Sequence, residues 1–214
     1  MTGDPGENQL WQTAQALNRA AAAVSPAVAV LPPLLFFTDP VRTTRPWEVA
    51  ARLPRGAGVV YRGFGRSERE VEARRLRRVT IERGVRLLIG QDVDLAGAVA
   101  ADGLHLPERD LDQAAALRAR HPDWLITGAL HGEAAVPGIE ALNAVVLSPV
   151  FRAGGASAGR PPLGTGVVTR HVAGLTVPAY GLGGITEQTA PALIGTGLCG
   201  LAAIDGVLQA FGAD

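Results

Sequence analysis

Lysine is absent from this 214-residue chain, so all 20 basic residues are arginines. Schiff-base catalysis and the nucleotide-binding P-loop both depend on a lysine, so the sequence excludes both. Cysteine occurs once, as Cys199, which excludes a disulfide bond within the chain. Because Cys199 lies in an apolar stretch, we expect a reduced, buried side chain and not a nucleophile.

A net charge and a long unbroken apolar run are also missing. The 20 acidic residues balance the 20 basic ones, which gives no electrostatic reason to expect binding to nucleic acid or to an acidic membrane. The apolar stretch over residues 20–37 contains three prolines, and the N-terminus carries Asp4 and Glu7 where a signal peptide has basic residues. We therefore expect neither a signal peptide nor a membrane-spanning helix, and we predict a cytoplasmic protein.

Short apolar runs alternate with helical patterns, and 47% of the residues are hydrophobic, which favours an α/β domain with a full core. The expected strands cover residues 34–38, 58–61, 86–89, 103–106, 124–127 and 143–147, followed by two glycine-rich strands that end near residues 182 and 204. This rhythm predicts a compact (β/α)8 TIM barrel over residues 31–214, preceded by an N-terminal helical extension over residues 1–30. The alternative is an open doubly wound sheet, but no glycine fingerprint follows the first strand.

Helical periodicity marks most segments between the strands. Residues 7–24 carry apolar side chains at spacings of four and three, so this helix is expected to cover the closed end of the barrel or, through Trp11, to form the subunit contact of a homodimer. Further helices are expected over residues 46–53, 67–83, 94–100, 111–120 and 132–142. Residues 148–163 are rich in Gly, Ala, Pro and Arg without an apolar period, which indicates a loop over a site.

A glycine-rich turn follows the seventh expected strand. Gly183 and Gly184 can adopt positive φ and let a ligand approach the main chain, and Thr186 is placed to cap a following helix. The eighth strand ends in a similar way at Ala203 and Ile204. Two such turns offer bare N–H groups to a phosphate, and many (β/α)8 barrels bind phosphate after strands seven and eight. A purely structural turn is the alternative.

Polar residues gather where the expected strands end, which is where (β/α)8 barrels place their active sites. His105 can have either a structural role or a role in the site. Asp110 can also be the N-cap of a helix. Asp39 precedes Pro40, which is typical of a turn. Arginine, histidines and acids beside phosphate turns indicate a phosphorylated or diphosphate substrate, with a divalent cation on carboxylates as an option. In chain order the residues are Thr38, Asp39, Arg62, Gln91, Asp92, His105, Asp110, His131 and Ser148.

A longer series of motifs runs through the same positions. It consists of Thr38-Asp39, Arg62, Asp94-Leu95-Ala96, Ala101-Asp102-Gly103-Leu104-His105-Leu106, Asp110, His131, Ser148-Pro149-Val150-Phe151, Gly183-Gly184-Ile185 and Gly200-Leu201-Ala202. In order and spacing this series resembles thiamine-phosphate synthase and its relative, the thiazole tautomerase. The resemblance covers residues 34–208 and identifies the chain as a divergent member of that family.

The resemblance implies a barrel enzyme that joins hydroxymethylpyrimidine diphosphate to thiazole phosphate and releases pyrophosphate, with Mg²⁺ on the diphosphate. Arg62 matches the diphosphate-binding arginine of the family, Asp110 matches one of its two magnesium carboxylates, and Gly183-Gly184 match its thiazole-phosphate turn. In the tautomerase branch, His131 matches the acid/base. His105 and Ser148 are then expected to contact the substrate.

Several family positions carry other residues in this chain. Val60 and Phe64 stand where the family has a glutamine and a lysine, and Gly90-Gln91 replaces the Asn-Asp pair that contacts the pyrimidine and Mg²⁺. Asp92 can serve as a metal ligand beside Gln91 if the loop shifts. Losing one of two carboxylates weakens Mg²⁺ binding, because this ion is held by one or two carboxylates together with substrate phosphates.

Arg152 and Arg160 lie in the loop over residues 148–163 and are the candidates for supplying the lost positive charge on the substrate. Three functions remain open. The first is a synthase-like transferase with an altered metal site. The second is an isomerase like the thiazole tautomerase, which needs His131 but not the diphosphate half of the site. The third is a non-catalytic binder of a phosphorylated ligand.

Overall fold

The computed structural model describes residues 8–132, 137–155 and 158–212, which contain a closed barrel of eight parallel strands. Each strand pairs with the next along the chain, and β8 closes the ring on β1, where Leu35 lies opposite Ala202. The predicted (β/α)8 barrel is therefore confirmed. The strands are β1 (Leu34–Phe37), β2 (Gly58–Tyr61), β3 (Arg86–Gly90), β4 (Gly103–Leu106), β5 (Leu125–Leu130), β6 (Ala144–Leu147), β7 (Ala179–Leu182) and β8 (Gly200–Ala203).

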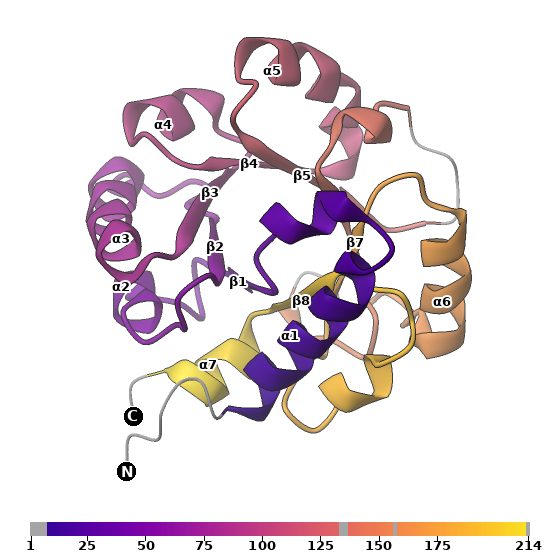
Figure 1. Ribbon diagram of the computed structural model, residues 1–214. Helices are drawn as coiled ribbons and strands as arrows, with labels where there is room; N and C mark the ends of the chain where they lie inside the picture. The colour runs from indigo at the N-terminus through magenta and orange to yellow at the C-terminus, as the bar shows by residue number, and fades with distance from the viewer. Residues whose placement is uncertain (1–7, 133–136, 156–157, 213–214) are drawn as a thin grey trace.

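Helices surround the strands in Figure 1. The α-helices are α1 (Gln9–Ala22), α2 (Pro46–Ala50), α3 (Arg69–Arg83), α4 (Val93–Ala98), α5 (Ala114–Arg120), α6 (Gly164–Gly174) and α7 (Asp205–Phe211). Short 3-10 helices are η2 (Pro26–Val30), η3 (Glu108–Gln113), η4 (Ile139–Ala141) and η6 (Ala190–Leu193). The helices expected up to residue 120 are confirmed to within a few residues, except that η3 forms the first part of the last one.

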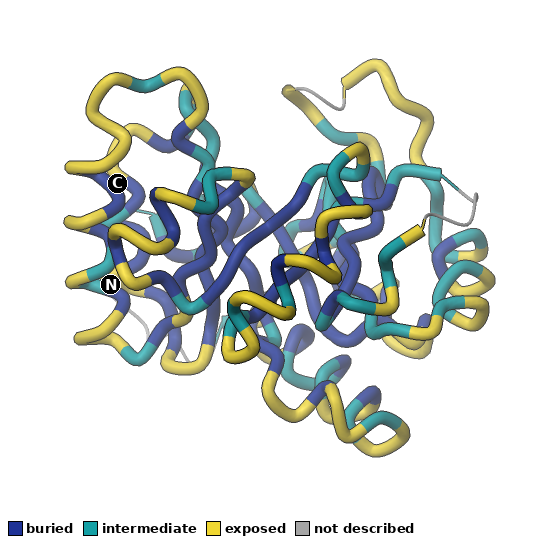
Figure 2. The backbone as a smooth tube through the Cα atoms, turned by 90° about the horizontal axis from the view of Figure 1, so that it is seen from above, coloured by how far each residue is buried: buried dark blue, intermediate teal, exposed yellow. Residues whose placement is uncertain are grey.

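The strands are buried on both faces. Leu35, Phe37 and Tyr180 belong to a cluster inside the barrel, whereas Leu34 and Phe36 belong to the larger cluster between the strands and the helices. Figure 2 shows this arrangement, with buried strands at the centre and exposed residues along the outer helices. Because both faces are covered, a parallel strand reads as an unbroken apolar run, which is why the sequence revealed these strands.

Helix α1 packs against the barrel wall and forms no separate layer. Asn8 caps the helix by accepting hydrogen bonds from the backbone N–H groups of Leu10 and Trp11. Trp11 is only 5% exposed within the chain, so the expected subunit contact through Trp11 is wrong. Asn18 Nδ2 donates a 3.0 Å hydrogen bond to the Cys199 carbonyl oxygen next to β8, which ties the helix to the closing strand.

The closed end of the barrel is covered by the segment after α1. Val28 in η2 and Leu31 are buried in the cluster inside the barrel, whereas the buried face of α1 belongs mainly to the outer cluster. The expected cover is therefore supplied by η2 and its neighbours more than by the helix. The division into an extension over residues 1–30 and a barrel over residues 31–214 remains a prediction.

Two expected helices are wrong. Of the helix expected over residues 132–142, the described part forms only the single turn of η4, since Pro137 and the positive φ of Gly138 (91°) interrupt helical geometry; residues 133–136 lie outside the described part. After Thr186 the chain forms only η6, which carries Pro191. Helix α6, by contrast, was not expected from the sequence.

Among the described residues, none of the helices combines the length and the apolar character that a bilayer crossing requires.

Candidate active site

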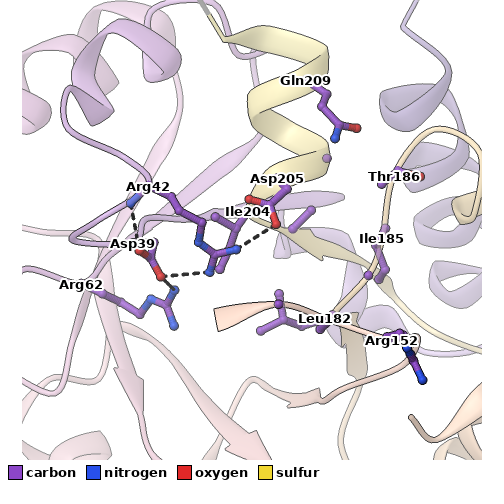
Figure 3. Close-up of a pocket in the computed structure, with 16 residues that line it drawn as sticks. Asp39, Arg42, Arg62, Arg152, Leu182, Ile185, Thr186, Ile204, Asp205 and Gln209 are labelled. Carbon is purple, nitrogen blue, oxygen red and sulfur yellow. Dashed lines mark hydrogen bonds and ion pairs between the residues drawn. The ribbon is translucent and has the colours of Figure 1, made fainter. Parts of the chain in front are cut away.

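A cavity of about 320 Å³ opens at the C-terminal ends of β1, β2, β7 and β8. Three arginines and two aspartates line it together with the glycine turn after β7. Figure 3 shows Asp39, Arg42 and Arg62 on one side of this cavity and Arg152 on the other. The concentration of arginines at this end of the barrel suits a negatively charged ligand.

The turn after β7 strongly favours glycine at two positions, Gly183 and Gly184. Gly183 and Gly184 have φ angles of 103° and 64°, which L-residues with a side chain rarely adopt. A Cβ atom on Gly184 would lie 2.4 Å from the Arg152 carbonyl oxygen, and one on Gly183 would lie 2.9 Å from Pro149. The turn therefore packs directly on the segment after β6, and its main chain lines the cavity.

Thr186 does not cap a long helix as expected but closes the glycine turn. Its backbone N–H donates a 2.9 Å hydrogen bond to Thr189 Oγ1, and that hydroxyl donates a 2.8 Å hydrogen bond to the Gly184 carbonyl oxygen. The two threonines thus fix the shape of the turn. Ala203 and Ile204, the other predicted phosphate-binding residues, line the same cavity where α7 begins.

Arg62 follows β2 and is held in place by β1. Its backbone N–H donates a 2.8 Å hydrogen bond to Thr38 Oγ1, and its Nε donates a 2.6 Å hydrogen bond to the Thr38 carbonyl oxygen. Burial lowers the pKa of the Arg62 guanidinium, and the Asp39 carboxylate, 3.9 Å from Nη2, opposes that shift. With Nε bound to the protein, the Nη groups of this cation remain directed to the cavity that they line.

Arg42 was missed by the sequence analysis although it lines the cavity. Its Nη2 lies 2.9 Å from Asp39 Oδ2, and its Nη1 lies 2.8 Å from Asp205 Oδ2. Asp39 also accepts hydrogen bonds from the backbone N–H groups of Val41 and Arg42, so the expected turn at this aspartate is present. The Arg42 guanidinium beside it lowers the pKa of Asp39 to about 2. The only signal in the sequence was a cation three residues after the strand-end aspartate.

His105 points into the barrel from β4. Its ring packs edge to face on Phe37, with ring centroids 4.9 Å apart, and its Nδ1 lies 3.0 Å from Thr127 Oγ1. Burial, with further contributions from the charges of Arg62 and His131, lowers the pKa of His105 to about 3. At neutral pH this histidine is therefore uncharged.

His131 and Ser148 meet across β5 and β6. The His131 Nδ1 lies 3.0 Å from Ser148 Oγ and 3.1 Å from the Ser148 carbonyl oxygen. A carbonyl oxygen can only accept, so this contact favours the tautomer with hydrogen on Nδ1 and leaves Nε2 as an acceptor. The peptide bond from Ser148 to Pro149 is cis. The backbone N–H of His131 donates a 3.2 Å hydrogen bond to Glu108 Oε2, which fixes the start of this loop.

Two of the three predicted metal ligands follow β3, and the third follows β4. Gln91, with a φ of 64°, and Asp92 line a second cavity of about 340 Å³. Asp92 is already engaged, since Oδ1 accepts from the Leu95 N–H at the start of α4 and Oδ2 lies 3.3 Å from Arg69 Nε. Asp110 lies in η3, with Oδ2 3.7 Å from Arg109 Nε. In the described part of the chain, no group of three or more His, Cys, Asp or Glu residues could hold a metal ion.

The two arginines expected to supply extra charge are placed differently. Arg152 is exposed and lines the cavity, on the side opposite Arg42 in Figure 3. Arg160 is also exposed but is not part of the cavity lining. The structure thus brings Arg152 together with Arg62, Gly183 and Gly184, and leaves Arg160 outside that group.

Comparison with known proteins agrees with the barrel and with its motifs. The model of the TMP-TENI family, described as thiamine monophosphate synthase, matches residues 38–207. The thiamine-phosphate synthase of Azoarcus sp. is 40% identical over 145 residues, which are 65% of this chain and 68% of the relative. A protein of Geobacter sulfurreducens described as a putative thiamine-phosphate synthase is 32% identical over 138 residues, 64% of this chain and 65% of the relative.

Other relatives are covered less fully, and a solved structure shares the fold. The match to the bifunctional thiamine biosynthesis protein ThiM/ThiE of Symbiobacterium thermophilum spans only 29% of that protein. The thiamine phosphate pyrophosphorylase of Pyrococcus furiosus superposes with a TM-score of 0.68 at 21% identity, over 85% of this chain and 88% of the other. Because the family model spans most of the barrel, the chain belongs to the thiamine monophosphate synthase family.

Proposed function

We propose that the protein is a thiamine-phosphate synthase, a transferase that joins hydroxymethylpyrimidine diphosphate to thiazole phosphate and releases pyrophosphate. The observation that carries this proposal is the cavity in which Arg42, Arg62 and Arg152 face a glycine turn at the C-terminal end of the barrel. Membership of the family supports it, as do relatives named thiamine-phosphate synthase whose aligned segments span about two thirds of their length.

The chemical step needs stabilisation of negative charge. The bond between the carbinyl carbon and the diphosphate oxygen breaks, its electron pair stays on the diphosphate, and the thiazole nitrogen supplies the electron pair of the new C–N bond. Arg62 is suited to stabilise the leaving diphosphate, because Thr38 and Asp39 fix the guanidinium before any ligand binds. A preorganised cation costs no reorganisation at the moment of bond cleavage.

The thiazole phosphate is assigned to the turn after β7. Gly183 and Gly184 allow the phosphate to approach the main chain, and Ala203 and Ile204 complete the same wall of the cavity. Arg152, whose carbonyl oxygen packs on the turn, lines the same cavity and adds positive charge, and it forms no ion pair within the described part of the chain. In this arrangement the phosphate of one substrate and the diphosphate of the other lie on opposite sides of the barrel mouth.

The remaining polar residues are assigned to the heterocycles. His105 is neutral and Ser148 is buried, so both provide hydrogen bonds without adding charge near the carbon that loses its leaving group. His131 is oriented by Ser148 and presents Nε2. These three side chains come from β4, the end of β5 and the end of β6, so a ring between them is contacted from one side of the barrel.

Magnesium is proposed to enter with the diphosphate. When bound, the ion neutralises charge on the diphosphate, as it does in other phosphoryl sites. Asp110 fits the role of protein ligand, because among the described residues its ion-pair contacts are limited to a 3.7 Å approach to Arg109. Asp92 does not fit as it is placed, since a helix N-terminus and Arg69 occupy its two oxygens. Gln91 offers a neutral amide oxygen at the neighbouring position.

Calorimetric titration of the purified protein tests the proposal. We expect thiazole phosphate to bind with or without Mg²⁺, and hydroxymethylpyrimidine diphosphate to bind with Mg²⁺. Binding of thiazole phosphate alone would remove the transferase and leave the isomerase or the non-catalytic binder. Binding of neither compound would mean that the cavity serves a different ligand.

Isomerisation of the thiazole phosphate is a second candidate function. It is favoured by the contact between His131 and Ser148, which engages Nδ1 and leaves Nε2 to exchange a proton with the thiazole. A His131→Ala variant should lose isomerase activity, whereas His121→Ala, which removes a ring stacked on Trp124 outside the barrel, should keep it. Equal activity of the His131 variant and the unmodified protein would remove His131 as the base.

Two further expectations remain predictions. We expect the protein to act in the cytoplasm, and we expect any homodimer to use a surface other than that of Trp11, which the chain itself covers.

A further inference from the structure

An internal ion pair occupies Arg42, one of the three arginines that line the cavity with the glycine turn. In Figure 3 the Arg42 guanidinium lies between two carboxylates, and dashed lines join it to Asp39 and Asp205. Arg42 comes from the loop after β1, whereas Asp205 is the first residue of α7, after β8. All three side chains line the cavity that also contains Gly183 and Gly184.

The two sides of this bridge differ in strength. Asp39 is 19% exposed in its side chain, and two backbone N–H groups hold its other oxygen. The Asp205 side chain is 53% exposed, and within the described residues its carboxylate accepts a hydrogen bond from Arg42 alone. Exposed ion pairs contribute little to stability. Arg42 is thus anchored on Asp39 and only lightly held by Asp205.

We propose that Asp205 competes with the phosphate of the ligand for Arg42 and thereby sets the affinity of this cavity for phosphorylated compounds. The inference rests on the proposed function, because it takes the glycine turn to be the phosphate site. Arg42 becomes a phosphate-binding residue once its Nη1 leaves Asp205, and Asp205 becomes a specificity-determining residue that weakens binding of any phosphate monoester.

The physical reason is charge. A phosphate at Gly183 and Gly184 enters a cavity whose wall already carries the Asp205 carboxylate. The negative charges of the phosphate and of this carboxylate repel each other. A hydrogen bond between guanidinium and phosphate is charge-assisted on both sides, so Arg42 exchanges one anionic partner for another. Asp39 keeps its bond to Nη2 during the exchange, so the guanidinium rotates on a fixed point and is not released into solvent.

The test is a comparison of phosphate affinities. Inorganic phosphate, and then thiazole phosphate, is titrated against the unmodified protein and Asp205→Asn, with bound phosphate followed by ³¹P NMR. We expect Asp205→Asn to bind both probes roughly tenfold more tightly, equivalent to about 1.4 kcal/mol. The control Asp123→Asn removes an exposed carboxylate before β5, at the opposite end of the barrel, and should leave both affinities unchanged. Equal affinities for the Asp205 variant and the unmodified protein would overturn the proposal.

A second variant separates competition from simple repulsion. If Asp205 acts by holding Arg42, then the gain from Asp205→Asn should largely disappear in an Arg42→Gln background. A full tenfold gain in that background would mean that Arg42 takes no part, and it would overturn the competition. Urea unfolding of each variant shows whether a changed affinity comes from a changed fold.

Failure of this inference and failure of the proposed function give different results. The inference fails when removal of the Asp205 charge leaves phosphate binding unaltered, even if the protein makes thiamine phosphate. The proposed function fails when no thiamine phosphate forms, even if the Asp205 variant binds phosphate more tightly.

Discussion

Arg62 Nε lies 2.6 Å from the Thr38 carbonyl oxygen, so a main-chain acceptor on one strand end fixes the orientation of a cation on the next. The Phe37 ring lies beneath the same guanidinium, with Cζ 5.5 Å from the ring centroid. These contacts therefore hold the Arg62 guanidinium in position before a ligand binds.

Replacing Arg62 should slow catalysis strongly while leaving the fold in place. Arg62→Ala should lower kcat/KM for the pyrimidine diphosphate by roughly 100-fold or more, because a preorganised charge on the leaving group is lost. Arg62→Lys keeps the charge but not the planar fork, so it should recover only part of the activity. Steady-state kinetics measure both variants, and unchanged kcat/KM in Arg62→Ala would remove this residue from the mechanism.

Gly184 offers a test of the phosphate turn with a matched control. Gly184→Ala places a Cβ 2.4 Å from the Arg152 carbonyl oxygen at a φ of 64°, whereas Gly195→Ala has a φ of 85° and nothing within 4 Å of the new atom. Both variants carry the strain of a positive φ, about 1–2 kcal/mol. We expect only Gly184→Ala to raise KM for thiazole phosphate, by at least about tenfold. Equal KM values for the two variants would mean that the turn is purely structural.

Asp39 and Asp205 should contribute unequally to stability although both bind Arg42. The pKa of Asp39 falls from 3.8 to about 2 in the folded protein, so its carboxylate stabilises the fold by about 2 kcal/mol at neutral pH. This contribution is present above pH 4 and is lost as the pH falls through about 2. Urea unfolding at pH 7 should show a larger loss for Asp39→Asn than for Asp205→Asn, and equal losses would contradict the anchoring of Arg42 on Asp39.

The burial of His105 should make the free energy of unfolding depend on pH in a second range. Its pKa is lowered to about 3 in the folded protein, below the ordinary value of 6.5, so the unfolded chain takes up a proton first as the pH falls. The contribution to stability is therefore full above pH 6.5 and declines toward pH 3, with a slope of at most about 1.4 kcal/mol per pH unit. Unfolding measured from pH 7 to pH 4.5 should be less pH-dependent in His105→Gln. Parallel profiles for the two proteins would show that His105 is not buried as a neutral ring.

The barrel could be predicted because each of its strands has a recognisable pattern in the local sequence. The strands β2 and β4 match the expected ranges residue for residue, since each is a short apolar run between turn residues. The helix expected over residues 132–142 was wrong because apolar spacing outweighed Pro137 and Gly138, which break helical geometry. The position of α1 outside the barrel could not be read from its amphipathic pattern, because a pattern shows that a face is covered but not by what.

In the candidate site, only residues whose own type and position in the sequence indicate a function could be predicted. Arg62, Gly183, Gly184 and Arg152 stand out in the sequence, and the structure gathers them around one cavity. The contact between Arg42 and Asp205 joins residues 163 positions apart and arises only when β8 closes on β1. Likewise, nothing in the sequence distinguishes an aspartate that binds metal from Asp92, whose oxygens are taken by the start of α4 and by Arg69.

The most direct test of the central claim is product formation. Purified protein is incubated with hydroxymethylpyrimidine diphosphate, thiazole phosphate and Mg²⁺, and thiamine phosphate and pyrophosphate are measured by mass spectrometry and a coupled assay. We predict that both products form in equal amounts and that Arg62→Ala forms both roughly 100-fold more slowly or worse. Absence of thiamine phosphate from a correctly folded protein that binds both substrates would contradict the assignment as a synthase.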